Sequence, residues 1–413
     1  MGVCRSGGCG GRVFTFVSCE GGEGICPDTI SLQALQNCKM SGVGAVSSFQ
    51  KRGKARVVSI PGARPSVHNS QLLLSTGMPS LDHLLGGGLP VGSILLLEQD
   101  RHDVYSKLFL KYYLAEGVMS GHMLTLASLD ESPQTLMATL PASTDRDADE
   151  DSTTGTDRQM TIAWRYQNQS APPAGLSSNR FSHSFDLTGT MEEDQVAKVD
   201  TCLFDGSEVE SPASTGYYWP LLQHIERRIT EGGLSTACNK AKTNVMRLAV
   251  HSLASPLWGW EFSRQEKDHQ WHRLTTFFYG LRALVRSSFC VCLVTVPSHL
   301  FHDTALIRRL QSLADFVVRL ESFQGSDKET NPIFKDYHGL FHVVKLAAIN
   351  TLVPPQLDAT DWVFKLRRRR MVIERLHLPP ELSETVSRSQ EDPLTKPRGM
   401  ACMGEKLPRN LEF

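Results

Sequence analysis

The segment from Ser75 to Ile94 constrains the fold more than any other part of the chain. It reads Ser-Thr-Gly-Met-Pro-Ser-Leu-Asp-His-Leu-Leu-Gly-Gly-Gly-Leu-Pro-Val-Gly-Ser-Ile. Pro79 is typical of a helix start, the leucines that follow share one helical face, and the triple glycine Gly86–Gly88 favours the end of that helix. The chain then enters the fully apolar run Ile94–Leu97, which predicts a strand buried on both faces.

Further apolar strand-like runs alternate with helical periodicities along the middle of the chain. Strands are expected at 123–127, 246–250, 289–296 and 316–318, and helices at 107–119, 218–229, 271–285 and 306–313. The later runs Gly339–Leu346 and Trp362–Leu376 have no long helix between them. Alternation followed by consecutive strands predicts an α/β fold whose sheet is mainly parallel, flanked by helices, with a C-terminal antiparallel extension.

The 413 residues allow one large domain with appendages. We predict a Gly-rich disordered tail over 1–46, a folded domain over 47–388, and a flexible tail over 389–413. Within the domain, polar composition predicts exposed loops at about 141–158 and 187–216.

The formal net charge of -1 gives the molecule no overall electrostatic attraction to nucleic acid or membranes. No run approaches the roughly 18 apolar residues of a membrane-spanning helix. Metal binding is not expected, because Cys4, Cys9, Cys19, Cys26 and Cys38 lack the paired spacing of a zinc site. The group His299, His302 and Asp303 is better explained by solvent exposure and helix capping than by a metal ion.

The segment 75–94 resembles the stretch that precedes the first core strand in RecA-family ATPases of the RadA and KaiC kind. In active members that strand runs into GxxxxGK[ST], whose backbone N–H groups cradle phosphates while the lysine neutralises charge. Here the strand runs into Glu-Gln-Asp-Arg-His-Asp-Val-Tyr-Ser, residues 98–106, with no glycine. Val104 stands at the second glycine, Tyr105 at the lysine and Ser106 at the Ser/Thr.

The carboxylates of Glu98, Asp100 and Asp103 are expected close to any incoming triphosphate, and Arg101 and His102 would offset only part of their charge. Two like charges about 4 Å apart repel by roughly 4 kcal/mol at a surface-like dielectric. The interior strand that should end in a magnesium-binding carboxylate ends instead in His251 and Ser252. The sequence therefore predicts a RecA-like core without a functional phosphate loop, and no catalytic residue.

The run Arg367–Arg370 is the strongest basic patch of the chain. As a strand it would point alternate arginines to opposite faces. Two interpretations remain open: contact with RNA phosphates, or a charged edge strand protected against mispairing.

Motifs spread over the core resemble the PAXNEB family of Elongator complex subunits, from about Ser47 to Arg388. Besides the segment 75–94 they are Ser-Pro-Leu-Trp-Gly at 255–259, Leu-Glu-Ser-Phe at 320–323, Thr-Asn-Pro at 330–332, Lys-Asp-Tyr-His-Gly-Leu at 335–340 and Glu-Arg-Leu-His-Leu-Pro-Pro-Glu-Leu-Ser at 374–383.

The resemblance implies a non-catalytic subunit that forms a heterohexameric ring with the fifth and sixth Elongator subunits. That ring is expected to bind tRNA and to support modification of the wobble uridine at carbon 5. The catalytic and scaffold subunits of Elongator would be further partners, and the cytoplasm and nucleus its locations. The chain alone would bind no cofactor, so any ATP would lie at ring interfaces. Analogy with RecA-like rings makes Lys328, Lys335, Arg367, Arg368, Arg369 and Arg370 candidate RNA contacts.

Two alternatives remain: a stand-alone RecA-like ATPase acting on nucleic acid, and a purely structural ring component. Saturable ATP binding by the isolated chain would favour the first. A tRNA affinity unchanged by charge reversal at Arg367–Arg370 would favour the second.

Overall fold

A computed structural model of the chain describes most of its central part. The described residues are 60–66, 71–144, 181–209, 216–238, 242–259, 267–301, 303–351, 353, 355–357 and 359–376. The predicted tails and most of the predicted loop 141–158 lie outside these residues. No helix among them is long and apolar enough to cross a membrane.

A nine-stranded sheet forms the centre of the described part, in the order β14-β13-β12-β11-β4-β10-β9-β5-β8. Every neighbouring pair from β11 to β8 is parallel, whereas β12, β13 and β14 join antiparallel. The strands are β4 (Ile94–Glu98), β5 (Met123–Ala127), β8 (Thr201–Phe204), β9 (Met246–Val250), β10 (Cys290–Val296), β11 (Phe316–Ser322), β12 (Gly339–Lys345), β13 (Trp362–Leu366) and β14 (Met371–Arg375). The predicted α/β fold with a mainly parallel sheet and a C-terminal antiparallel extension is confirmed.

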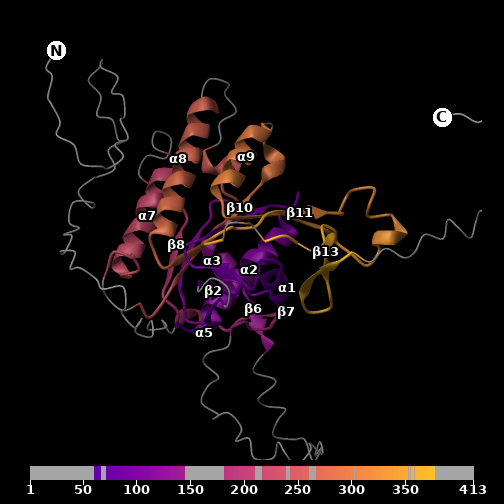
Figure 1. Cartoon of the computed structure of the whole chain (residues 1–413), viewed down its shortest axis with the longest axis horizontal. Helices are drawn as coiled ribbons and strands as arrows, with labels where there is room; N and C mark the ends of the chain where they lie inside the picture. The colour runs from indigo at the N-terminus through magenta and orange to yellow at the C-terminus, as the bar shows by residue number, and fades with distance from the viewer. Residues whose placement is uncertain are drawn as a thin grey trace, which may run out of the picture. The chain divides into compact units, whose positions relative to one another are not determined.

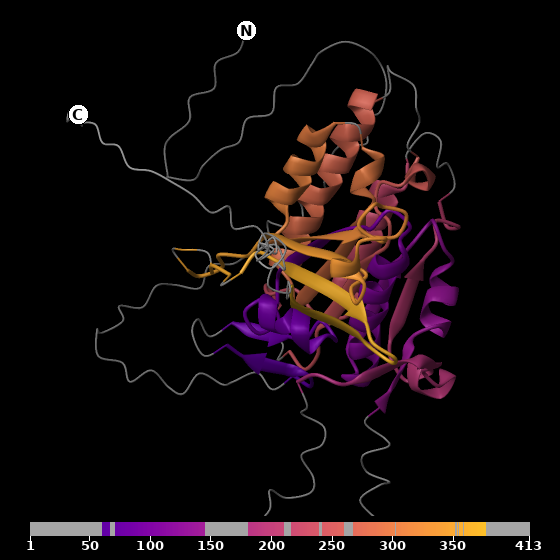
Figure 2. The same ribbon diagram turned by 90° about the vertical axis from the view of Figure 1, so that its right-hand side faces the viewer.

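Helices cover both faces of this sheet, as Figures 1 and 2 show. On one side lie α1 (Pro79–Leu84), α2 (Val104–Met119) and α3 (Pro133–Ala138), and on the other α7 (Tyr218–Glu231), α8 (Lys267–Arg286) and α9 (Thr304–Leu313). Side chains of β4 alternate between the two layers: Leu95 and Leu97 join the core under α2, while Ile94 and Leu96 join the core under α8 and α9. Burial on both faces explains why β4 is apolar throughout.

Two smaller sheets and several short elements complete the described residues. They are β1 (Ala63–Pro65), β2 (Leu72–Leu74) and β3 (Leu89–Pro90) in one sheet, β6 (Pro141–Ser143) and β7 (Phe185–Thr190) in another, helix α5 (Glu193–Ala197), and the 3-10 turns η6 (Pro256–Trp258), η7 (Ser298–Leu300) and η8 (Pro332–Phe334).

The exposed loop predicted over 187–216 is wrong for its first part. That segment contains most of β7, all of α5, and β8, which is an edge strand of the main sheet. The first three residues of β8 are only partly buried and β7 has several partly exposed residues, so neither strand has the apolar composition of β4. Because β7 and β8 contain polar residues, the sequence pattern did not predict them as strands.

Parallel strands bring their carboxyl ends to one edge of the sheet. The segments that follow β4, β9 and β10 therefore meet there, although they are far apart in the sequence. Hydrogen bonds join them directly: the Gln99 side chain donates to Ser252 Oγ (2.8 Å) and to Thr295 Oγ1 (3.0 Å). This edge holds the loop that joins β4 to α2.

Candidate functional site

Glu98 ends β4. Its side chain is 1% exposed. Its carboxylate accepts from Arg319 Nε at 2.7 Å and from Gln311 Nε2 at 2.6 Å. Arg319 is the register partner of Glu98 on the neighbouring strand β11. Glu98 therefore joins β4, β11 and α9, and its charge is paired within the chain.

Asp100 lies in the loop before α2, which begins at Val104, and is likewise 1% exposed. One of its oxygens, Oδ1, accepts from the backbone N–H of Tyr105 (3.2 Å) and of Ser106 (2.9 Å) and from the Ser106 hydroxyl (2.5 Å). The other, Oδ2, accepts from the backbone N–H of Val104 at 3.1 Å. These are the first N–H groups of the helix, the donors with which a phosphate loop would hold its ligand.

Asp103 and His251 connect the loop to the residue that follows β9. His251 Nε2 lies 2.8 Å from Asp103 Oδ2, and His251 Nδ1 lies 3.1 Å from Ser128 Oγ. His251 follows β9 directly, at the position where an ATPase of this kind would carry its magnesium ligand, and it is 1% exposed. This position supplies an imidazole paired with a carboxylate.

Tyr105, which stands in place of the phosphate-loop lysine, packs against the C-terminal strands. Its ring contacts those of Phe364 (centroids 4.8 Å apart) and His338 (5.9 Å). Burial, and then the nearby Asp100, raise the pKa of its hydroxyl above the usual value. The side chain is therefore a neutral packing residue and offers no charge to a phosphate.

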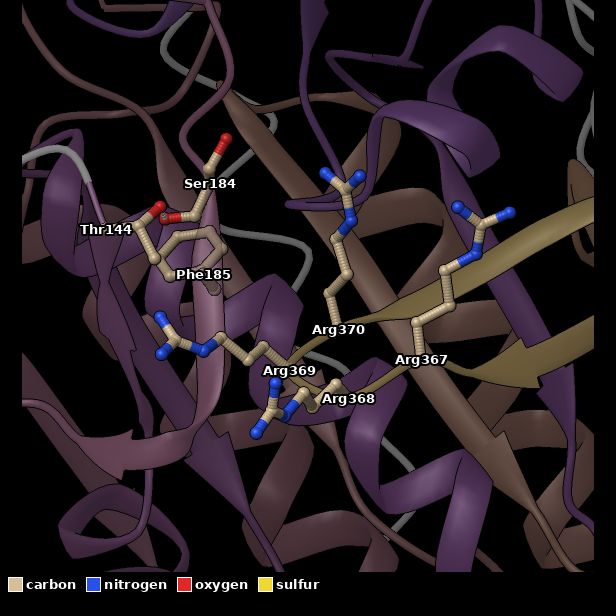
Figure 3. A pocket seen from close by; sticks show the side chains of 7 residues that line it. All are labelled: Thr144, Ser184, Phe185, Arg367, Arg368, Arg369 and Arg370. Carbon is tan, nitrogen blue, oxygen red and sulfur yellow. Dashed lines mark hydrogen bonds between the residues drawn. The ribbon is translucent and has the colours of Figure 1, made fainter. Parts of the chain in front are cut away.

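The four arginines 367–370 form the turn between β13 and β14, which we call the arginine turn. Arg367 and Arg370 close it by backbone hydrogen bonds of 2.8 and 3.2 Å. The strand assumed in the sequence analysis is wrong for these residues, because the segment reverses direction here. In Figure 3, Arg367 and Arg370 extend to one side of the turn, and Arg368 and Arg369 to the other, so the side chains do not alternate.

The arginine turn lies against β7 and α2. Leu187 N–H donates to the carbonyl of Arg369 at 2.7 Å, and Met371 N–H donates to the Tyr112 hydroxyl at 3.1 Å. The turn borders an open depression of about 340 Å³ together with Thr144, Ser184 and Phe185 (Figure 3). All four arginines are exposed.

Only two of these arginines have an ion-pair partner among the described residues. Arg367 lies 3.3 Å from Glu374, and Arg369 lies 3.5 Å from Asp186. Arg368 and Arg370 have none within the part of the chain that the structure describes. The turn therefore presents two exposed guanidinium groups whose charge is not neutralised nearby, which suits a phosphate-bearing partner.

The family model for the PAXNEB protein matches residues 56–413. The chain belongs to the PAXNEB family. Curated relatives include Elongator complex protein 4 of Xenopus laevis, which is 44% identical over 85% of this chain and 91% of its own length. The proteins of that name from Danio rerio and Homo sapiens are each 42% identical, covering 89% and 84% of this chain and 96% and 88% of their own length.

Among solved structures, the chain is similar to the KaiC-like protein PH0186 of Pyrococcus horikoshii. The match covers 73% of this chain and 98% of that protein, at 15% identity and a TM-score of 0.38. At this level it carries no argument about function. Membership of the PAXNEB family rests on the sequence.

Lys328 and Lys335 lie on another part of the PAXNEB chain, in the segment between β11 and β12. Lys328 Nζ is 2.6 Å from Glu321, whose pKa is lowered by its hydrogen bonds to Lys328 and His342 against the opposing effect of burial. Lys335 is exposed. Since Lys328 is neutralised within the chain, it is a weaker candidate for an RNA contact than Arg368 and Arg370.

Metal-binding candidates are not assembled in the part of the chain that the structure describes. No group of three or more His, Cys, Asp or Glu residues there could hold an ion. Asp303 caps α9 by accepting from Ala305 N–H at 2.7 Å, while His302 and the five N-terminal cysteines lie outside the described residues. Burial lowers the pKa of His299.

Several site residues of this PAXNEB chain were missed in the sequence. Arg319 neutralises Glu98, Gln99 ties the loop to β9 and β10, and Asp186 pairs with the arginine turn. Arg319 gave one signal, since it is a charged residue inside an apolar strand. Its partner Glu98 could not be predicted, because a local pattern of residues does not specify the order of strands in a sheet.

Proposed function

We propose that this PAXNEB chain is a non-catalytic subunit of an Elongator complex. Relatives that carry the name Elongator complex protein 4 share 42–44% identity with it over most of their length. The loop after β4 supports the non-catalytic part, because Asp100 already takes the N–H donors that a nucleotide phosphate would need. The hydrogen bonds from these N–H groups to Asp100 are the main structural support for a non-catalytic role.

Its partners in this proposal are the fifth and sixth Elongator subunits, arranged with it in a heterohexameric ring, and the catalytic and scaffold subunits. The ring binds tRNA and supports modification of the wobble uridine at carbon 5, in the cytoplasm and nucleus. Any ATP bound by the ring lies at interfaces between subunits, because the intrachain position is filled by Asp100.

The arginine turn is the RNA contact in this proposal. A guanidinium binds phosphate oxygens through two parallel N–H donors, and Arg368 and Arg370 are exposed and have no ion-pair partner among the described residues. Arg367 and Arg369 contribute less, since they already form ion pairs with Glu374 and Asp186. Such contacts read the backbone, so the turn binds tRNA without selecting a base sequence.

The first experiment is mass spectrometry of wobble uridines in total tRNA from cells with and without the chain. Loss of the carbon-5 side chains on its removal, and their return when the chain is restored, are the expected results. Normal levels after removal would refute the Elongator assignment.

A second experiment separates an RNA-binding subunit from a purely structural one. The ring is assembled with Arg368→Glu/Arg370→Glu, and its tRNA affinity is compared with that of rings carrying Arg308→Glu/Arg309→Glu, a matched reversal of two exposed arginines on α9. We expect a loss of affinity only with the first pair. Equal affinities would favour the structural role. Saturable ATP binding by the isolated wild-type chain would instead revive the stand-alone ATPase.

A further inference from the structure

The beginning of α2 is arranged like an anion-binding site. The first N–H groups of any helix lack partners within the helix and lie at the positive end of its dipole. Here Val104, Tyr105 and Ser106 supply three such N–H groups, and Ser106 adds its hydroxyl. In phosphate-binding loops, donors of this kind converge on one ligand. In this chain they converge on the carboxylate of Asp100.

This contact differs from ordinary helix capping. The residue at the N-cap position is Asp103, whose backbone is left-handed with φ 54° and whose side chain does not cap the helix. The capping carboxylate comes from three residues further back and uses both oxygens, where an ordinary cap satisfies one or two N–H groups with a single oxygen. A nearly inaccessible carboxylate therefore occupies the centre of the donor cluster.

The surrounding contacts hold Asp100 in that place. Gln99 is anchored on Ser252 and Thr295, and Glu98 is anchored on Arg319, so the two residues before Asp100 are fixed to three neighbouring strands. On the other side, Asp103 is fixed by His251. The left-handed backbone of Asp103 is maintained by these contacts, since a non-glycine residue adopts it only at a cost.

We propose that Asp100 is a built-in substitute for a phosphate group. Its carboxylate accepts from the first N–H groups of α2, where a phosphate-binding loop would hold its ligand. The wild-type chain therefore has no free donors for a nucleotide phosphate at this position. Removing the carboxylate would uncover an anion site that the wild-type chain never exposes. This inference does not depend on the Elongator assignment.

Anion rescue of Asp100→Ala in the full chain tests the substitution. We expect its melting temperature to fall by roughly 2–8 °C, because three N–H groups lose their acceptor and the Ser106 hydroxyl keeps only Asp103. Inorganic phosphate, compared with chloride at equal ionic strength, should raise that temperature in a saturable way. The wild type should show no saturable rise.

The matched control is Asp82→Ala. Asp82 is also buried and also accepts from a backbone N–H (Thr76, 2.7 Å) and from the hydroxyls of Ser75 and Thr76, but it does not cap a long helix. We expect a loss of stability without phosphate rescue. An equal phosphate response in Asp100→Ala and Asp82→Ala, or no specific response in Asp100→Ala, would overturn the proposal.

Asp100→Asn covers the case in which Asp100→Ala does not fold. It keeps one oxygen acceptor and loses the charge and the second acceptor, so it should fold. Amide hydrogen exchange at Val104, Tyr105 and Ser106 should then be faster than in the wild type, while exchange in the middle of α2 stays the same. Unchanged exchange at these three amides would also overturn the proposal.

Discussion

The loop between β4 and α2 and the arginine turn between β13 and β14 are both rich in charged side chains. In the loop, Glu98, Asp100 and Asp103 each have a partner within the chain, and the first two are buried. In the turn, two of four arginines have no ion-pair partner among the described residues, and all four are exposed. A buried charge must be satisfied internally, whereas an exposed one remains free for another molecule.

The two regions differ in how many of their charged groups remain available to another molecule. A loop in the place of a nucleotide site invites a catalytic interpretation, yet its groups are used up in holding strands and a helix together. The arginine turn still has two guanidinium groups without an ion-pair partner among the described residues. Changes in the loop should therefore alter mainly stability, and changes in the turn should alter mainly binding.

In the loop, a loss of stability is expected from Arg319→Met. It leaves the buried carboxylate of Glu98 with only Gln311 as a side-chain donor, and because the Arg319 side chain is 45% exposed, losing this charge-assisted hydrogen bond should cost about 2 kcal/mol. Denaturant unfolding of the full chain measures the loss. Arg308→Met, on the exposed face of α9, should change the free energy of unfolding by no more than about 0.5 kcal/mol. Equal losses in both variants would mean that Glu98 does not need its partner.

A pH effect is expected from His122, whose Nδ1 accepts from Nε of the fully buried Arg247 at 2.9 Å. Burial and the adjacent guanidinium lower the pKa of His122 from 6.5 to about 3. Below pH 6.5 the unfolded chain binds a proton that the folded chain refuses, so stability falls as the pH falls toward 3, by up to about 1.4 kcal/mol per pH unit. Above pH 6.5 His122 contributes nothing.

His122→Gln should remove that part of the slope. The measurement is the free energy of unfolding of wild type and variant between pH 7 and pH 4, taken as a difference so that other groups cancel. Parallel curves would show that His122 is not held neutral in the folded chain.

In the turn, Arg368→Ala/Arg370→Ala should reduce the dependence of tRNA affinity on salt. Each lost phosphate contact lowers the slope of log affinity against log salt by about 0.7–0.9, so the pair should lower it by about 1–2. The control is Arg367→Ala, whose guanidinium already pairs with Glu374 and which should change the slope less. A larger change from Arg367→Ala would reverse the distinction between paired and unpaired arginines.

The smallest effect concerns Asp186, the partner of Arg369. Hydrogen bonds from Thr188 lower its pKa most, and Arg369 adds a weaker contribution. Arg369→Ala should therefore raise the pKa of Asp186 slightly, and Thr188→Ala should raise it more, as followed by NMR titration. The opposite order would show that the ion pair at the turn is stronger than its exposure suggests.

Much of the fold could be predicted from local patterns. The apolar run 94–97, the helix that begins near Lys107, and the consecutive strands after Gly339 all appear where the sequence predicted them. The segment 187–204 could not be predicted, because partly exposed strands such as β7 and β8 keep polar residues. The arginine turn was misjudged because four arginines have no periodicity that separates a strand from a turn.

The sequence by itself determined that this chain belongs to the PAXNEB family and that the segment 98–106 contains no glycine, since both are properties of the order of residues. Only the tertiary structure decided which partners the charged residues of that segment find. Glu98 meets Arg319 and Asp103 meets His251 because the parallel sheet brings β4, β9 and β11 to one edge, and these contacts hold the loop in which Asp100 accepts from the first N–H groups of α2. Pairings between residues 148 or 221 positions apart follow from strand order, which no local pattern specifies.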